Sequence, residues 1–91
     1  MRTIWKFPIT TDGVGRMPEG AEILSVQTQD GHPYLWALVN PSAPTEDRKF
    51  RLYGTGHHTP DSPGRYWGTF QLKVIGDQNL VFHLFELVDE L

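Results

Sequence analysis

The chain has 91 residues, which is enough for one small domain but leaves little room for a large core. Hydrophobic residues make up 38% of it, including three Trp, three Tyr and five Phe, and this content excludes a disordered chain. The formal net charge of −3 argues against general nucleic-acid binding, and the lack of cysteine excludes disulfides and thiolate metal sites.

The N-terminal residues predict one strand followed by a long loop. Residues 2–7 alternate and carry aromatic side chains, and Pro8 ends this strand or confines it to a sheet edge. Residues 10–20 contain three glycines and Pro18, so we expect a loop there.

The next two runs predict a β-hairpin. Residues 21–28 and 33–40 are β-prone, and Asp30-Gly31 between them is a strong hairpin signal. The second run is apolar on both faces, so we expect this strand to be covered on both sides.

Three further strands are predicted after a proline-rich loop at residues 40–47. Residues 48–53 alternate, with Phe50 and Leu52 on one face. Residues 65–74 also alternate, and the pattern directs inward Tyr66, Gly68, Phe70, Leu72 and Val74, and outward Trp67, Thr69, Gln71 and Lys73.

The last predicted strand covers residues 80–87, after a turn at residues 76–79. It is apolar on both faces, and His83 on one of them is expected to be a hydrogen-bonded core histidine. The chain is therefore expected to be a single all-β domain, 1–91, a small antiparallel sandwich or barrel of about six strands. Two strands with two apolar faces also predict a homo-oligomer that buries the spare face.

The candidate ligand site is the stretch that follows the strand at residues 48–53. Gly54 and Gly56 allow positive φ around Thr55, and such a backbone turn can direct consecutive N–H groups toward an anion. Imidazole and guanidinium donors and aromatic stacking surfaces complete the predicted site, which also includes Arg51, Tyr53, His57, His58, Arg65 and Trp67.

The local charge supports an anionic ligand. Residues 48–73 contain five cations, from Arg48 to Lys73, against the single acid Asp61, whereas the rest of the chain is strongly acidic. The alternatives are that these charges are solvated strand faces and that the glycines only shape a strand-end bulge.

Neither a metal site nor an enzyme is predicted. Adjacent histidines such as His57 and His58 point to opposite faces of a strand, so they do not readily share a metal ion. The alternative is a histidine-based phosphoesterase, in which His57 or His58 performs general acid–base chemistry with Asp61, but no nucleophile elbow, carboxylate pair or metal signature is present. Binding without catalysis, metal or cofactor is therefore the preferred hypothesis.

Several segments resemble a family of small proteins encoded by tailed phages and prophages, mostly without assigned function. The segments, which span nearly the whole chain, are Lys6-Phe7-Pro8-Ile9, Met17-Pro18-Glu19-Gly20-Ala21, Ile23–Gln27, Leu35–Val39, Tyr53-Gly54-Thr55-Gly56-His57, Gly68-Thr69-Phe70-Gln71 and Phe82-His83-Leu84-Phe85-Glu86. The resemblance implies a phage origin and expression in the cytoplasm of an infected bacterium. It assigns no catalytic residue.

Small phage proteins of this kind often counter host defence, and those called sponges sequester nucleotide second messengers. By analogy, we expect a sponge for a small anionic nucleotide, with no membrane partner and no sequence-specific nucleic acid. The alternatives are a module that binds a host protein and a structural or virion-associated component. No stretch approaches the roughly 18 apolar residues of a membrane span, and the N-terminus lacks the apolar run of a signal peptide.

Overall fold

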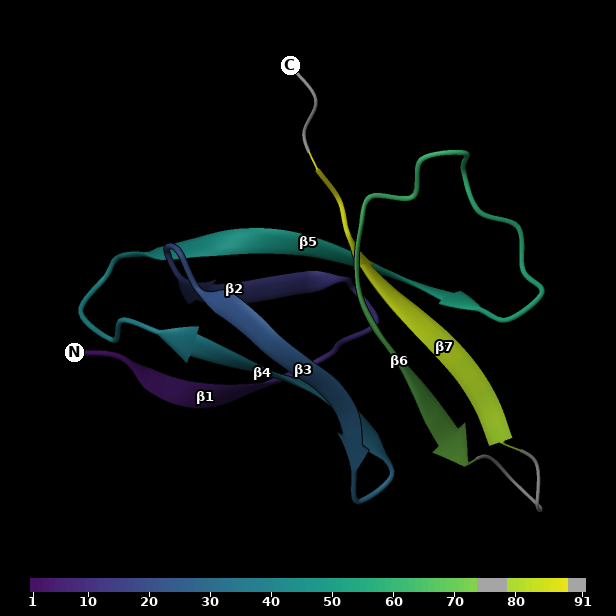
Figure 1. Cartoon of the computed structure of the whole chain (residues 1–91), viewed down its shortest axis with the longest axis horizontal. Coiled ribbons are helices and arrows are strands. Elements are labelled where there is room, and N and C mark those ends of the chain that lie inside the picture. Colours follow the sequence, from purple (N-terminus) through teal and green to yellow (C-terminus); the bar gives the residue numbers. More distant parts are fainter. Residues whose placement is uncertain (74–78, 89–91) are drawn as a thin grey trace.

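The computed structural model describes residues 1–73 and 79–88, and within them it contains seven strands and no helix. The strands form two antiparallel sheets (Figure 1). The first sheet has the order β1 (Thr3–Pro8), β4 (His32–Val39), β3 (Glu22–Gln29). The second has the order β2 (Val14–Pro18), β5 (Thr45–Gly54), β7 (Asn79–Glu86), β6 (Arg65–Lys73). The all-β prediction is confirmed, with one strand more than expected and two sheets rather than a closed barrel.

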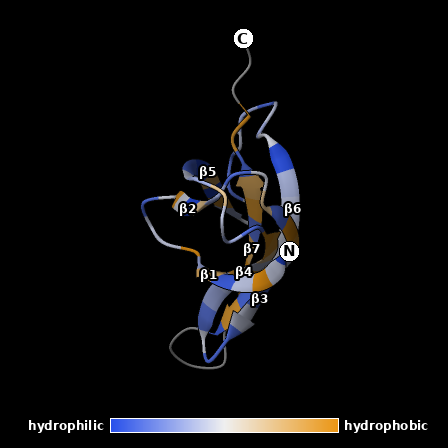
Figure 2. Cartoon of the chain, turned by 90° about the vertical axis from the view of Figure 1, so that its left-hand side faces the viewer, coloured by the Kyte–Doolittle hydropathy of each residue, from blue (hydrophilic) through white to orange (hydrophobic). Residues whose placement is uncertain are grey.

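The core lies between the two sheets and follows the alternation of the strands. Gly68 of β6 faces β3 so closely that a Cβ there would lie 3.1 Å from the Cβ of Val26. In Figure 2 the hydrophobic stretches include β7 in the middle of the molecule. The buried apolar residues are Met17, Ala21, Ile23, Val26, Leu35, Ala37, Val39, Phe50, Phe70 and Leu84.

The loop predicted at residues 10–20 is wrong for Val14–Pro18, which form β2. Val14–Pro18 pairs with the start of β5, which begins at Thr45, inside the second predicted loop. Gly15 is needed here for packing and not for a turn, since a Cβ would lie 2.9 Å from a ring carbon of Phe50.

The predicted hairpin between β3 and β4 is confirmed. Asp30 and Gly31 both have positive φ, 53° and 78°, as the tight turn of a twisted two-stranded hairpin requires. Of the turn predicted at residues 76–79, residues 76–78 lie outside the described residues, and Asn79 begins β7.

A β-bulge reverses the predicted orientation of two aromatic residues in β6. Tyr66 pairs with Phe85 and Gly68 pairs with Leu84, so Trp67 is an extra residue between the two pairs. Tyr66 consequently lies on the solvent side with 54% of its surface exposed, whereas Trp67 packs against the core. The alternation is correct from Gly68 onward, because Phe70 is buried and Leu72 half-buried.

No helix in the described part of the chain is long and apolar enough to cross a membrane.

Candidate functional site

The second sheet has an outer face, the side turned away from the core, that combines aromatic and basic residues. Because Phe50, Leu52 and Leu84 point into the core, the intervening residues of β5 and β7 point outward. The strand register then places them in two rows across three strands, Arg51–Phe85–Tyr66 and Tyr53–His83–Thr69.

Three aromatic rings form a continuous surface on this face. The Phe85 ring lies between the other two, with centroids 5.8 Å from Tyr53 and 5.5 Å from Tyr66. Tyr66 is the most exposed, while Phe85 and Tyr53 are half-buried. Arg51 lies directly opposite Phe85 and is exposed, so a cation borders the aromatic surface.

A chain of hydrogen bonds runs beside these rings and ends at the predicted glycine loop. The Thr69 hydroxyl lies 2.5 Å from the Tyr66 hydroxyl and 2.9 Å from His83 Nδ1, and His83 Nε2 lies 2.8 Å from Thr55 Oγ1. The bonds can run in either direction: Tyr66 to Thr69, Thr69 to Nδ1 and Nε2–H to Thr55, or the reverse. In the first direction Thr55 is free to donate to the carbonyl of Val81, 3.5 Å away.

His83 is thus a part of the outer face and not of the core, contrary to the prediction. Both of its ring nitrogens are hydrogen-bonded to threonine hydroxyl groups. The sequence singled out Thr55 but missed His83, Thr69 and Tyr66, because only the pairing of β6 with β7 brings them together.

The Gly-Thr-Gly-His loop is a closed turn and not the predicted cluster of free N–H groups. The N–H of Thr55 donates to Val81 O at 3.0 Å, and that of His57 donates to Gly54 O at 3.0 Å. The imidazole of His57 lies over Gly54, 2.8 Å from where a Cβ would be, so a larger residue at 54 would displace this exposed side chain, and Gly56 has a φ of 87°. His57 and His58 are both exposed.

The loop nevertheless borders a hollow at this end of β7. The hollow measures about 350 Å³ and is lined by Gly54, Thr55, His57, Asn79, Leu80, Val81 and Phe82. Its walls offer apolar surface beside the hydroxyl of Thr55 and the imidazole of His57, two of the polar side chains that the sequence placed in the site.

Arg65 and Trp67 lie at the opposite end of β7 from the glycine loop, so the predicted site does not converge on one point. Gly54 pairs with Phe82, whereas Arg65 pairs with Glu86, four residues further along, which corresponds to about 13 Å. The guanidinium of Arg65 lies 4.3 Å from the centre of the Trp67 ring, so it covers the stacking surface predicted for a ligand.

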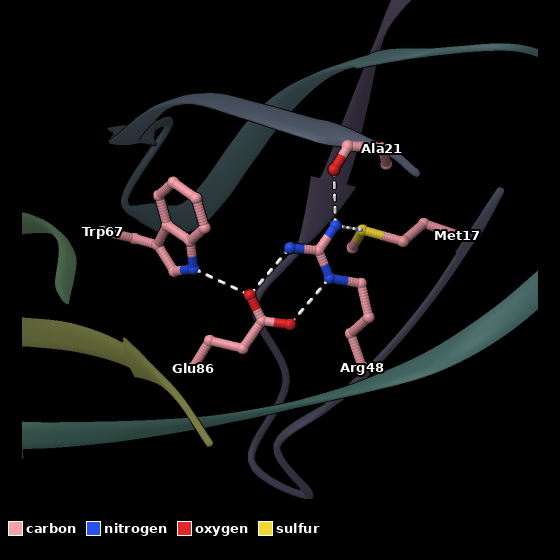
Figure 3. A network of polar contacts seen from close by, with 5 residues as sticks. All are labelled: Met17, Ala21, Arg48, Trp67 and Glu86. Atoms are coloured by element: carbon pink, nitrogen blue, oxygen red, sulfur yellow. Dashed lines mark hydrogen bonds and ion pairs between the residues drawn. The ribbon is translucent and has the colours of Figure 1, made fainter. Parts of the chain in front are cut away.

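Trp67 belongs instead to a part-buried polar network around Arg48 and Glu86 (Figure 3). Arg48 donates to both carboxylate oxygens of Glu86 at 2.7 Å, and Trp67 Nε1 donates to the same carboxylate at 2.9 Å. Arg48 also donates to the carbonyl of Ala21 at 2.6 Å, which ties the start of β3 to β5 and β7. This network is structural, because its donors and acceptors are consumed within it.

The network determines the ionisation of its two charged members. Burial alone would raise the pKa of Glu86, but the hydrogen bonds from Arg48 and Trp67 outweigh it and hold the pKa below its usual value. The hydrogen bond to Glu86 raises the pKa of Arg48 despite partial burial. Arg48 is therefore not available to bind an anionic ligand. The cations of β5 that point to the outer face are Lys49 and Arg51.

Within residues 1–73 and 79–88, no three His, Cys, Asp or Glu side chains are close enough to hold a metal ion.

Comparison with known proteins places the chain in a family. No curated protein and no solved structure matches it. A family model described as a domain of unknown function, DUF7352, matches residues 1–90. Since this match covers nearly the whole chain, the protein belongs to the DUF7352 family.

Proposed function

We propose that the protein is a small phage-encoded binding protein that sequesters an anionic nucleotide signalling molecule without turnover, as an anti-defence sponge. The observation that supports this most is the outer face of the second sheet, where Tyr66, Phe85 and Tyr53 form an aromatic surface beside Arg51. A planar base binds aromatic side chains by stacking, and an arginine fork binds phosphate oxygens in pairs.

The spacing of these groups suits a single nucleotide unit. Arg51 and Phe85 are direct cross-strand neighbours, so their Cβ atoms are separated by about 4.5–5.5 Å. A base on Tyr66 and Phe85 would therefore bring its phosphate within reach of Arg51 and of Lys49, two residues earlier on the same face of β5. The hydroxyls of Thr69 and Thr55 supply hydrogen-bonding groups at the border of the aromatic surface.

The surroundings of His83 favour binding over catalysis. Both ring nitrogens of His83 are hydrogen-bonded, Nδ1 to the hydroxyl of Thr69 and Nε2 to that of Thr55. The imidazole would have to break one of these bonds before it could act as a general base on a ligand. A sponge needs affinity alone, and this rigid arrangement supports affinity.

Calorimetric titration and thermal shift with cyclic dinucleotides and ADP-ribose derivatives test the proposal. A bound nucleotide should raise the melting temperature by several degrees at saturating concentration. Tyr66→Leu should raise the dissociation constant roughly 5- to 150-fold, because stacking on one aromatic side chain contributes about 1–3 kcal/mol per base. Arg51→Gln should weaken it as well, since the phosphate loses its cation.

Arg16→Gln is the matched control. Arg16 lies on the same face but in β2, where it is engaged with Asp47 at 3.2 Å, so its loss should leave affinity unchanged. A Thr55→Val/His57→Ala double variant shows whether the glycine loop contributes to binding. Chromatography of the ligand released by heat should recover it intact.

Two results would contradict the proposal. If none of these nucleotides changes the melting temperature, the outer face does not bind them. If the protein converts several molecules of nucleotide to product per protein molecule, it is an enzyme and not a sponge.

A further inference from the structure

The outer edge of β1 is an open strand edge with apolar side chains on both sides. In the described structure β1 is the first strand of its sheet and is hydrogen-bonded on one side only, to β4. Five of its six residues are exposed. Ile4 is 56% and Trp5 40% exposed, and as neighbours in a strand they point to opposite faces.

The four sheet edges in the described residues differ in their regularity. β3 contains a bulge between Ile23 and Ser25, and β6 contains the bulge at Trp67. β2 has only five residues. β1 pairs with β4 without interruption from Thr3 onward, and its proline, Pro8, stands only at the C-terminal end of the strand. Bulges and short strands are common protection against edge-to-edge association, and β1 has no bulge.

A lysine in an edge strand would normally give similar protection, but Lys6 is drawn away from the edge. Its amine lies 4.6 Å from the centre of the Tyr34 ring and donates to Gln29 Oε1 at 2.8 Å. Tyr34 and Gln29 belong to β4 and β3, so the charge lies over the sheet and not beside its edge.

We propose that β1 pairs antiparallel with β1 of a second copy of the chain, centred on Trp5. In a two-fold symmetric antiparallel pair, opposing residues share a face, so the axis must pass through a residue and not between two residues. Centring on Trp5 places Trp5 opposite Trp5, Ile4 opposite Lys6 and Thr3 opposite Phe7. Both exposed apolar side chains then gain a neighbour, and the two three-stranded sheets become continuous.

The distribution of charge along the strand selects this register and this occupant. Centring on Ile4 would place Arg2 opposite Lys6, and centring on Lys6 would place the two lysines opposite each other. Like charges directly opposite destabilise a strand pair. The Trp5 register avoids both conflicts and uses nearly the full length of β1, so the strand is complementary to itself.

Single-cysteine variants test the register, because the natural chain contains no cysteine. Cα atoms of directly opposed residues lie about 4.5–5.5 Å apart, within the range that a disulfide spans. Trp5→Cys should therefore form a disulfide-linked dimer under mild oxidation. Ile4→Cys alone and Lys6→Cys alone should not, because the two copies of each cysteine would be offset by two residues, about 8 Å. An equimolar mixture of Ile4→Cys and Lys6→Cys should form the mixed disulfide.

Light scattering during size-exclusion chromatography provides the second measurement. The wild-type mass should rise from 10.4 kDa toward twice that value with increasing concentration, and Trp5→Glu should remain at 10.4 kDa at every concentration. The mixture of Ile4→Cys and Lys6→Cys keeps Trp5 in place, so it tests the pairing even if Trp5→Cys folds poorly. A wild-type protein that stays monomeric throughout, or Ile4→Cys alone crosslinking as fast as the mixture, would overturn the proposal. Neither result bears on nucleotide binding, because β1 belongs to the other sheet.

Discussion

At the scale of single residues, the carboxylate of Glu86 is the acceptor at the centre of the part-buried polar network. It accepts hydrogen bonds from Arg48 and Trp67, and the two charged side chains are only 14% and 16% exposed. Glu86→Gln would leave the guanidinium of Arg48 part-buried without its counter-ion. Breaking a fully buried pair costs about 3–5 kcal/mol, so we expect about 2–3 kcal/mol for this slightly exposed one.

Urea denaturation measures this cost, and the second ion pair of the described chain provides the comparison. Arg16 and Asp47 are 69% and 54% exposed, so Asp47→Asn should change the free energy of unfolding by no more than about 1 kcal/mol. Equal losses in the two variants would show that the Arg48–Glu86 pair is not the structural centre that its burial indicates.

At the scale of elements, the connection from β5 to β6 depends on glycines for two different reasons. β5 and β6 both pair antiparallel with β7, so the connection must cross from one end of β7 to the other. It leaves beside Val81 and returns at Gly64, whose φ is 109° and whose missing Cβ faces the carbonyl of Glu86. Gly56 has a φ of 87°, but no atom lies within 4 Å of where its Cβ would be.

This difference predicts unequal effects of the same substitution. Gly56→Ala should cost about 1 kcal/mol, the strain of a left-handed residue alone. Gly64→Ala adds a clash with the backbone of β7 and should cost about 3 kcal/mol or more. Thermal denaturation of the two variants gives the comparison, and similar melting temperatures would contradict the close approach of Gly64 to β7.

The elements that the sequence predicted correctly are those with local signals. The hairpin of β3 and β4 is specified by adjacent residues, Asp30 and Gly31, and the alternation of Phe50 and Leu52 identifies the inner face of β5. β2 was missed because Gly15 resembles a loop residue, whereas it serves the packing of Phe50. Its role depends on a strand more than thirty residues away, so no local pattern could reveal it.

The candidate site shows the same division between local and non-local information. Tyr53 and Arg51 were placed correctly on one face by alternation, and Thr55 was correctly put at the end of that strand. The bulge at Trp67 was not visible in the sequence, and it exchanges Trp67 for Tyr66 on the outer face. His83 joins the site only through the pairing of β7 with β5 and β6, which alternation within β7 could not predict.

At the scale of the whole molecule, two carboxylates couple the stability of the fold to pH. Hydrogen bonds from Thr10 and from the backbone of Val14 lower the pKa of Asp12 in the turn between β1 and β2, and the network described above lowers that of Glu86. In both cases the unfolded chain binds the proton more tightly than the folded chain. Both contributions are therefore fully present above the unfolded pKa values, near 4, and are lost as the pH falls through the lower, folded values.

The melting temperature should consequently change little between about pH 7 and pH 5 on account of these two groups, and should fall as the solution is acidified further. An Asp12→Asn/Glu86→Gln double variant should start from a lower melting temperature at neutral pH, because it lacks the ionic contacts, and should fall less steeply in acid. Calorimetry from pH 7 to pH 2 compares the two slopes. Asp12 is fully exposed and Glu86 is part-buried. We therefore expect Glu86→Gln alone to account for most of the difference in slope between the wild type and the double variant. A wild-type slope retained by the double variant would mean that acid unfolds the protein through other carboxylates.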